Sequence, residues 1–326
     1  MSLEVFWFIL IAVMFVAFFF LEGFDFGVGI LQFFLGKNEK ERGTYIYTIA
    51  PHWNANEVWL LVAGGSMFAA FPRWYATFFS ALYLPFVILL LALIVRGGSF
   101  EIRHRANIPK LRFVLDVLLV ISNFALALLT SIAMANLAIG IPIDSNGNFI
   151  GSVLDLVHPF ALFCGILGLS LFITNGALFL SLKIEGELQI RAYRVLKPAV
   201  ITSVVLFAIT AALVWEHNII YVAALAFILG AAVFIFNKSL KVAFFMVALC
   251  TICSVAGLFL AMYPNVLVSS IAENSITIAN AASSHYTLKI MSFTAAIFVP
   301  IILAYQIWSY YIFHKRINPR NANLEV

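Results

Sequence analysis

The chain has 326 residues, of which 63% are hydrophobic and 10% are charged, and its mean hydropathy is +1.04. This composition excludes an ordinary soluble domain, in which about a quarter of the residues are charged. The formal net charge of +4 does not indicate nucleic-acid binding, because the basic residues fall in alternate loops. We therefore expect an all-α, polytopic membrane protein with no nucleic-acid partner.

Apolar runs separated by Gly, Pro and polar breaks predict nine transmembrane helices. In chain order the runs cover residues 6–32, 58–71, 75–95, 114–140, 159–182, 198–215, 219–236, 242–263 and 288–313. The second run is short for a span unless its helix starts back near Asn54.

Lysine and arginine residues gather in alternate loops. All but two of the 19, Arg73 and Lys289, follow the first, third, fifth or seventh run or lie in the carboxyl-terminal tail. Cytoplasmic loops of membrane proteins carry an excess of basic residues. The pattern therefore places the amino terminus outside and the carboxyl terminus in the cytoplasm, in agreement with an odd number of spans.

The first run contains two carboxylates, Glu22 and Asp25. Residues three apart lie on one helix face. An acid near the bilayer centre is unfavourable by at least about 2.5 kcal/mol, so such acids usually face protein or water and have a function. Alternatively, both acids lie at the inner membrane boundary and are simply solvated. A helix from Val5 reaches Glu22 after about 26 Å, near the far edge of a core about 30 Å thick.

More polar and aromatic residues gather at the start of the second run and the end of the third. They are His52, Trp53, Asn54, Glu57 and Trp59, followed by Arg96 and Glu101. Helical spacing places Trp53, Asn54 and Glu57 on one face. Carboxylates with an arginine near the inner membrane face have two interpretations: a structural ion-pair network that locks the first three helices, or a proton inlet.

A weak internal repeat divides the chain into halves. Glu22-Gly23 in the first run and Asn175-Gly176 in the fifth occur at the same depth, and both runs cross the membrane in the same direction. This repeat indicates two parallel four-helix halves plus a ninth helix. We expect one transmembrane domain, 1–326, with helices 1–4 in about 5–140, helices 5–8 in about 158–263 and helix 9 in about 286–313.

The histidines give no sign of a haem site. Haem is normally held by His, Met or Cys side chains. All six histidines map to loops or span ends: His52, His104, His158, His217, His285 and His314. A lone methionine within a span is usually a packing residue. We therefore expect no catalytic residue, cofactor ligand or metal site in this chain itself.

Seven segments, in order along the chain, resemble subunit II of the cytochrome bd-type quinol oxidases. They are residues 22–29, 51–60, 63–72, 96–103, 174–176, 186–188 and 283–288. The resemblance implies nine helices, arranged as two four-helix bundles and one peripheral helix, pseudo-symmetric with subunit I.

The resemblance also implies a bacterial terminal oxidase of the cell membrane. Such an oxidase oxidises quinol near the outer face, passes electrons through haem b558, haem b595 and haem d, and reduces oxygen to water with cytoplasmic protons. In this family the haem ligands and the quinol-oxidising loop belong to subunit I, the expected partner. A structural quinone or lipid and a small accessory transmembrane subunit are further components that the resemblance allows.

The family further suggests a role for the polar residues. In typical members an acid in the block Trp-Asp-Gly-Asn lines a proton path toward the haems. Here Asn54 occupies that position, and asparagine can orient a water but cannot carry a proton. Glu57, one turn along, is the nearest titratable replacement, with Glu22 and Asp25 as further candidates and His52 beside them.

The other residues near this block are expected to have structural roles. Arg96 and Glu101 would form structural or charge-compensating contacts. Trp53 and Trp59 would pack or anchor the helix at the interface.

Two rival functions remain open at this point. A stand-alone secondary transporter would also have many spans and intramembrane acids, but it should show broken helices at the midplane of both halves. The charged residues of this chain cluster at one membrane face instead. A purely structural partner subunit would have no proton path at all.

Overall fold

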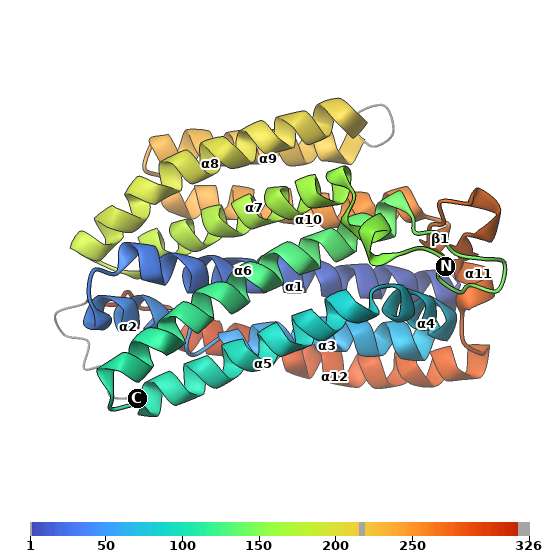
Figure 1. Ribbon diagram of the computed structural model, residues 1–326, viewed down its shortest axis with the longest axis horizontal. Helices are drawn as coiled ribbons and strands as arrows, with labels where there is room; N and C mark the ends of the chain where they lie inside the picture. The colour runs from blue at the N-terminus through green and yellow to red at the C-terminus, as the bar shows by residue number, and fades with distance from the viewer. Residues whose placement is uncertain (1, 215–218, 319–326) are drawn as a thin grey trace.

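The computed structural model describes residues 2–214 and 219–318, and every structural statement below concerns these residues. They form twelve α-helices, with two short 3-10 helices and one two-stranded sheet in the loops at one end (Figure 1). The α-helices are α1 (Leu3–Leu35), α2 (Glu39–Tyr47), α3 (Trp53–Ala70), α4 (Pro72–Ala81), α5 (Tyr83–Arg105), α6 (Pro109–Ile139), α7 (Pro159–Lys183), α8 (Glu187–Val214), α9 (Ile219–Phe236), α10 (Leu240–Met262), α11 (Ile278–Ala281) and α12 (His285–Ile312).

Eight helices are long and apolar enough to cross a membrane, namely α1, α5, α6, α7, α8, α9, α10 and α12. The 18-residue α3 begins at Trp53, which supplies the early start that the second run needs in order to be a ninth span. The all-α polytopic fold is therefore confirmed with eight to nine candidate spans.

The prediction of one unbroken helix over residues 75–95 is wrong. The chain forms α4 and then α5, with a break at Leu82, whose φ of −93° and ψ of 22° are not helical. Pro85 lies three residues beyond this break. In a continuous helix its ring would clash with the carbonyl group of Ala81 and its missing N–H would leave that carbonyl unpaired. A new helix that starts at Tyr83 puts Pro85 in its first turn, where proline is tolerated.

Helix α1 lies at the centre of the molecule and contacts α3, α6, α7 and α10. Its backbone comes closest to α7, where Gly27 faces Gly176. A Cβ atom added at Gly27 would lie 2.0 Å from the carbonyl oxygen of Phe172 and 2.8 Å from the Cα atom of Gly176. Small residues allow this approach between membrane helices. The pair α8 and α9 covers the far side of α7 and α10 (Figure 1).

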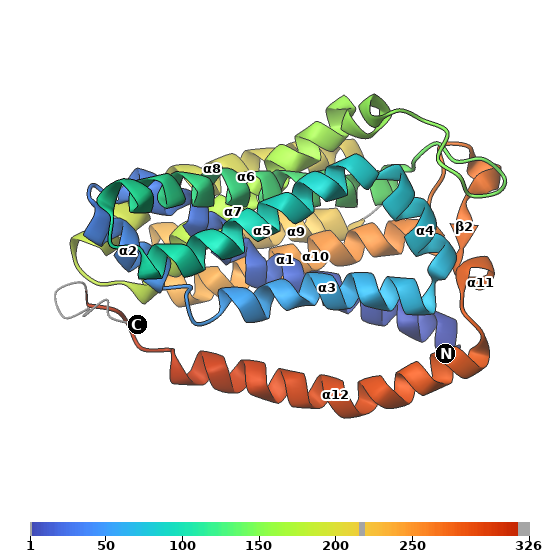
Figure 2. The same cartoon turned by 60° about the horizontal axis from the view of Figure 1, so that its bottom comes forward.

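Helix α12 lies along the outer edge of the bundle, beside α3 (Figure 2). Only two of its side chains are buried, Leu288 and Gln306. Near its start, the indole Nε1 of Trp7 donates to the Leu288 carbonyl and to Ser292 Oγ, at 3.3 and 3.0 Å. The helix is therefore attached to the bundle mainly near its two ends.

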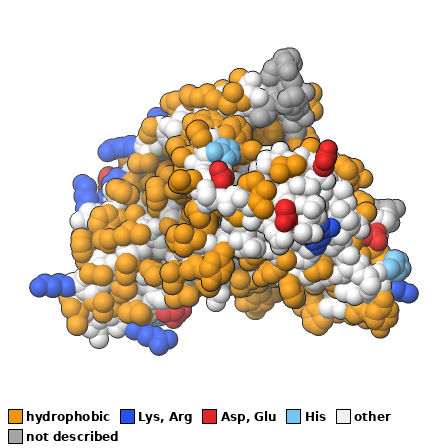
Figure 3. Space-filling view, turned by 45° about the vertical axis from the view of Figure 1, so that its right-hand side comes forward, with side chains coloured by type: hydrophobic (Ala, Val, Ile, Leu, Met, Phe, Trp, Pro, Cys, Tyr) orange, Lys and Arg blue, Asp and Glu red, His pale blue; other side chains and the backbone are white. Residues whose placement is uncertain are grey.

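The two ends of the bundle differ in charge. One end carries the 3-10 helices η1 (Val153–Val157) and η2 (Ala272–Asn274), the strands β1 (Asn265–Leu267) and β2 (Ile276–Thr277), and α11. Figure 3 looks toward this end, and most of the Lys and Arg side chains in view lie at the far left edge, away from it. The opposite end carries α2 and the basic loops.

Candidate functional site

The two acids of the first run are buried inside the bundle. Glu22 and Asp25 of α1 are both 0% exposed. The alternative in which they are simply solvated at the membrane boundary is therefore wrong. Every residue of α1 from Glu22 to Gln32 is buried. A buried carboxylate needs a partner of opposite charge or hydrogen-bond donors.

Arg96 of α5 provides the charge partner. Its Nη2 atom lies 2.8 Å from Glu22 Oε2, and its Nη1 atom lies 2.8 Å from Glu57 Oε2 of α3. The same Nη1 also donates to Glu22 Oε1 at 3.3 Å, and Nε donates to Asn123 Oδ1 of α6 at 3.1 Å. One fully buried guanidinium thus joins four helices. We call Glu22, Asp25, Glu57 and Arg96 the acid cluster.

Aromatic rings close the space around this guanidinium. The Arg96 Cζ atom lies 5.1 Å from the ring centre of Phe26, 5.7 Å from that of Trp53 and 5.6 Å from that of Phe100. Trp53 and Phe100 also stack on each other, with their centres 4.9 Å apart. Cation–π contacts of this kind are strongest where water is excluded. They fix the guanidinium plane between the two glutamates.

Asp25 connects the acid cluster to α12. Its Oδ2 atom accepts a hydrogen bond of 2.7 Å from Asn56 Nδ2. The Asn56 Oδ1 atom accepts two more, from Gln306 Nε2 at 2.8 Å and from the Tyr310 hydroxyl at 2.9 Å. The other Asp25 oxygen, Oδ1, is buried and has no hydrogen-bond partner among the described residues. A buried acceptor of this kind suits a bound water.

His52 lies just before α3, and its ring stacks on Tyr310 with the centres 4.2 Å apart. Burial, with a smaller contribution from Lys183, lowers the pKa of His52 to about 4. The ring is therefore neutral near pH 7 and can both donate and accept a hydrogen bond. Asp25, Asn56, Tyr310 and His52 form a polar line from the acid cluster toward the basic end of the bundle.

A second set of ion pairs ties the basic end together. Asp116 of α6 is fully buried and binds Arg42 at 2.6 Å and also Arg103. Glu41 of α2 binds Arg191 of α8 through two hydrogen bonds of 2.7 Å. These pairs hold α2 against α5, α6 and α8 below the acid cluster.

The contribution of the Glu41–Arg191 ion pair to stability can be tested by changing the pH. The hydrogen bonds from Arg191 lower its pKa below the ordinary value. The pair therefore stabilises the fold above the unfolded-state pKa of about 4.3, and the stabilisation is lost as the pH falls through the lower, folded-state pKa. We expect Glu41→Gln to lower the free energy of unfolding by about 1 kcal/mol at pH 7. In thermal unfolding, this difference should vanish at acid pH. Glu273→Gln, an exposed acid at the other end, should show no difference at either pH.

The structure brings together most of the residues that the sequence singled out, but not all. Trp59 is buried in the apolar core, as a packing residue would be. Glu101 does not join the acid cluster: its side chain is exposed and lies 3.8 Å from Arg105, one turn along the same helix. Asn54 does not share the inward face with Trp53 and Glu57, because its side chain is exposed.

Asn56 takes the place predicted for Asn54. Both residues flank the line from Trp53 to Glu57 at similar angles, one on each side, so helical spacing alone cannot choose between them. Because α1 and α12 pack against the side of α3 that carries Asn56, Asn56 is buried and Asn54 is exposed. Sequence reasoning also missed Asn123, Gln306 and Tyr310. Asn123 and Gln306 are polar residues inside long apolar runs, a signal that could have identified both.

The described histidines lie in loops or at helix ends. The described residues contain no group of three or more His, Cys, Asp or Glu side chains placed to hold a metal ion. Of the described histidines, His52 has a buried ring, and that ring is already stacked against Tyr310. His217 lies outside the described residues.

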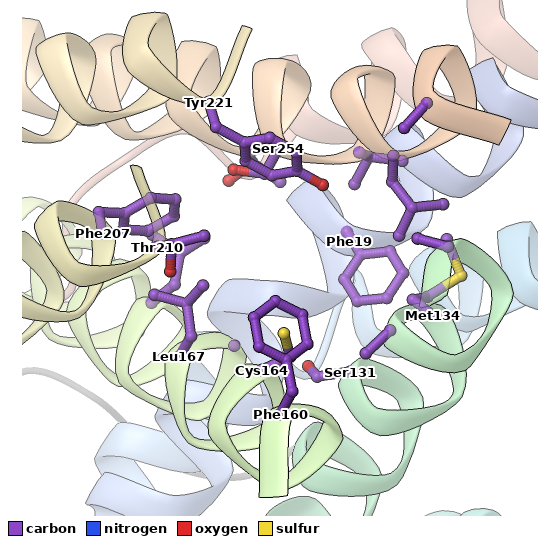
Figure 4. Close-up of a pocket in the computed structure, with 18 of the residues that line it drawn as sticks. Phe19, Ser131, Met134, Phe160, Cys164, Leu167, Phe207, Thr210, Tyr221 and Ser254 are labelled. Carbon is purple, nitrogen blue, oxygen red and sulfur yellow. The ribbon is translucent and has the colours of Figure 1, made fainter. Parts of the chain in front are cut away.

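Two apolar cavities open between the helices of the bundle. One, of about 270 Å³, is lined by α6, α7, α8, α9 and α10, with Phe19 of α1 at its wall (Figure 4). Hydroxyl groups of Ser131, Thr210 and Ser254 are among its few polar atoms. The other, of about 540 Å³, is lined by aromatic and aliphatic side chains of α1, α3, α4, α5 and α6. Both suit a hydrocarbon chain better than a polar substrate.

Comparisons with known proteins place this geometry in context. A family model described as cytochrome bd terminal oxidase subunit II matches residues 3–313. The chain is 39% identical over 330 residues to cytochrome bd ubiquinol oxidase subunit 2 of Bacillus subtilis, covering 97% of both chains. It is 31% identical over 356 residues to cytochrome bd-I ubiquinol oxidase subunit 2 of Escherichia coli K12, covering 95% of this chain and 94% of the relative. The bd oxidase structure from Geobacillus thermodenitrificans shares the fold, with a TM-score of 0.76 at 16% identity over 97% of this chain and 100% of that chain.

Proposed function

Because the chain belongs to the family of cytochrome bd terminal oxidase subunit II, we propose that it acts beside a haem-bearing subunit I in an electrogenic quinol oxidase. The complex would oxidise quinol, reduce oxygen to water and take up the protons for this reaction from the cytoplasm. Haems b558, b595 and d, held by subunit I, supply the electron transfer from quinol to oxygen. A small accessory transmembrane subunit would complete the assembly. The chain itself is a multi-pass membrane subunit of a bacterial respiratory oxidase.

The contribution of this chain is a proton path through the acid cluster. One observation carries the proposal: two carboxyl groups bind a single buried guanidinium, and a third, that of Asp25, is buried less than one helical turn from Glu22. If all four groups were charged, two negative charges would remain uncompensated in the interior, which is unfavourable. The excess of carboxyl groups therefore provides places where a proton can reside. Arginine itself cannot release a proton, so Arg96 holds the acids in place.

The exposure of the acids suggests the direction of proton movement. The Glu57 side chain is 18% exposed, whereas Glu22 is fully buried. Both accept hydrogen bonds from the same Arg96 Nη1 atom, so their oxygens lie close enough for one water to bridge them. Protons would enter at Glu57 and reach Glu22, while Asp25 and the line through Asn56 and His52 form a second branch.

The orientation and helix grouping complete the proposal. The amino terminus would lie outside and the carboxyl terminus in the cytoplasm, as the basic loops indicate. Helices α1, α3, α5 and α6 would form one four-helix bundle and α7 to α10 the other, within one domain over 1–326. The shallow burial of α12 supports its role as the peripheral ninth helix. The two apolar cavities are the places where a structural quinone or lipid would bind.

Glu57→Gln tests the proton path. Glutamine keeps an oxygen that can accept from Arg96 but cannot carry a proton. We expect oxygen consumption by the purified two-subunit complex to fall by about tenfold or more, as for the loss of a proton-transfer group. The haem content from the visible spectrum and the thermal midpoint should stay unchanged.

Glu101→Gln is the matched control, because it removes a carboxylate that is exposed and outside the acid cluster. Its turnover should equal that of the unmodified complex. Equal turnover in the Glu57 and Glu101 variants would contradict the path and leave only a structural role for the acid cluster.

A further inference from the structure

A third cavity, of about 400 Å³, lies at the basic end of the bundle, and none of its lining residues belongs to the acid cluster. It forms where α7 and α9 end and α10 begins, and the carboxyl-terminal tail after α12 closes one side. Three cationic side chains line it: Lys238, Lys241 and Arg316. They come from two separate segments of the chain, the turn between α9 and α10 and the tail.

The positive charge of this cavity is largely uncompensated. Lys238 and Lys241 form no ion pair within the part of the chain that the structure describes. Arg316 donates from Nη2 to the Ile184 carbonyl at 2.8 Å and lies 3.9 Å from Glu185 Oε1, with both side chains nearly half exposed. An exposed pair at this distance is weak. An anion in the cavity would therefore meet at least two cations with no competing partner.

Apolar side chains form the other wall of the cavity. Leu182, Leu240 and Val242 line it together with the cations. Next to it, Phe236 is 49% exposed and Phe245 is 59% exposed, on helices apolar enough to cross a membrane. The cavity thus lies where the membrane-facing surface of α9 and α10 meets the basic end. A free phosphate ion would contact only the cations, whereas a phospholipid would contact the cations with its headgroup and the apolar wall with its acyl chains.

We propose that this cavity binds the headgroup of an anionic phospholipid of the cytoplasmic leaflet. Its phosphate lies between Lys238, Lys241 and Arg316, and its acyl chains follow α10 past Val242 and Phe245. Clusters of basic residues between membrane helices at this level recognise anionic headgroups. The N–H groups at the start of α10 add to the attraction. Bound in this way, the lipid links the carboxyl-terminal tail to the turn between α9 and α10.

The test uses the purified two-subunit complex, titrated with phosphatidylglycerol or phosphatidylcholine and analysed by native mass spectrometry. The Lys238→Gln/Lys241→Gln variant removes two cations from the cavity. The control variant, Lys40→Gln/Lys110→Gln, removes two exposed cations from the same end of the bundle that do not line the cavity. We expect the affinity for one phosphatidylglycerol molecule to fall about tenfold or more in the cavity variant. The control should bind as the unmodified complex does, and phosphatidylcholine should bind all three weakly.

Three results would overturn the proposal. Equal phosphatidylglycerol binding by the cavity variant and the unmodified complex would exclude the site. An equal loss in the control variant would show a general surface attraction. Displacement of the lipid by inorganic phosphate at millimolar concentration, with phosphate alone binding to the cavity, would identify a free-anion site. Oxygen consumption and thermal midpoint should match among the three proteins, which confirms that the variants are folded.

Discussion

Replacing Arg96 with methionine is expected to lower the free energy of unfolding by about 3–5 kcal/mol, because it leaves buried carboxylates without their charge partner. Glu22 would lose both of its contacts to the guanidinium, and Glu57 would lose its short one. Methionine fills a similar length of space between the aromatic rings, so the loss would come from charge and hydrogen bonds more than from packing. The measurement is the thermal midpoint and the yield of the two-subunit complex.

Arg105→Met is the matched control, since the Arg105 side chain lies on the same helix and is 81% exposed. It should leave yield and midpoint unchanged. A variant that combines Arg96→Met with Glu22→Gln and Glu57→Gln removes the guanidinium together with the two carboxylates that contact it. We expect it to recover most of the stability, because a neutral polar group is less unfavourable inside a protein than an unpaired charge.

Oxygen consumption then separates the two interpretations of the acid cluster. If the acids carry protons, the triple variant is stable and slow. If they only lock the helices, it is stable and nearly as active as the unmodified complex. An Arg96→Met complex as stable as the Arg105→Met complex would contradict the view that the acid cluster depends on this guanidinium.

Much of the fold follows from the sequence because the bilayer restricts a spanning chain to a few solutions. Long apolar runs must be helices, and basic residues must avoid the core. Both rules act on local sequence, and they located α1, α6, α7, α9 and α10 to within about five residues. They placed the start of the sixth span at residue 198, whereas α8 begins at Glu187 and continues through Pro198, so this start was wrong. They failed at residues 75–95, where hydropathy stays high across a backbone break. Pro85, which causes the break, was visible in the sequence, but a mean hydropathy taken over a window of residues does not register a single proline.

The acid cluster was only partly predictable for a different reason. Glu22 and Asp25 were identified because charge in an apolar run is unusual on its own. The choice between Asn54 and Asn56 depends on which side of α3 packs against α1 and α12. Helical spacing alone does not give this side. The link from Asn56 to Gln306 and Tyr310 spans some 250 positions of sequence, so only the folded structure reveals it.

The continuous helices of the repeat argue against the rival transporter. Glu22-Gly23 lies within the 33-residue α1, and Asn175-Gly176 lies within the 25-residue α7. Transporters of the inverted-repeat type bind substrate where such helices are broken at the midplane. Here the two helices pack closely instead: Gly176 meets the backbone of Gly27, and Gly23 meets the side chains of Phe172 and Asn175.

Gly27→Ala is therefore expected to have the second large effect, through the contact between α1 and α7. The new Cβ atom would lie 2.0 Å from the Phe172 carbonyl oxygen, a backbone atom that no rotamer change can move. The helices must separate, and overpacking of this kind is unfavourable by about 1–3 kcal/mol or more. Because Glu22 and Asp25 lie on the displaced helix, turnover should fall together with the thermal midpoint of the purified complex.

Two glycine controls make this test specific to the backbone contact. Gly230→Ala in α9 places a Cβ atom 3.6 Å from Met246 Sδ, an ordinary contact, and should be neutral or slightly stabilising. Gly23→Ala meets the Phe172 side chain at 2.9 Å. The destabilisation by Gly23→Ala should therefore be relieved by Phe172→Leu, because leucine is smaller than phenylalanine and can move away from the new Cβ atom. The same second change should not rescue Gly27→Ala, because the atom in its way belongs to the backbone of α7. Rescue of both variants by Phe172→Leu would mean that the aromatic ring, and not the approach of the two backbones, sets the distance between the halves.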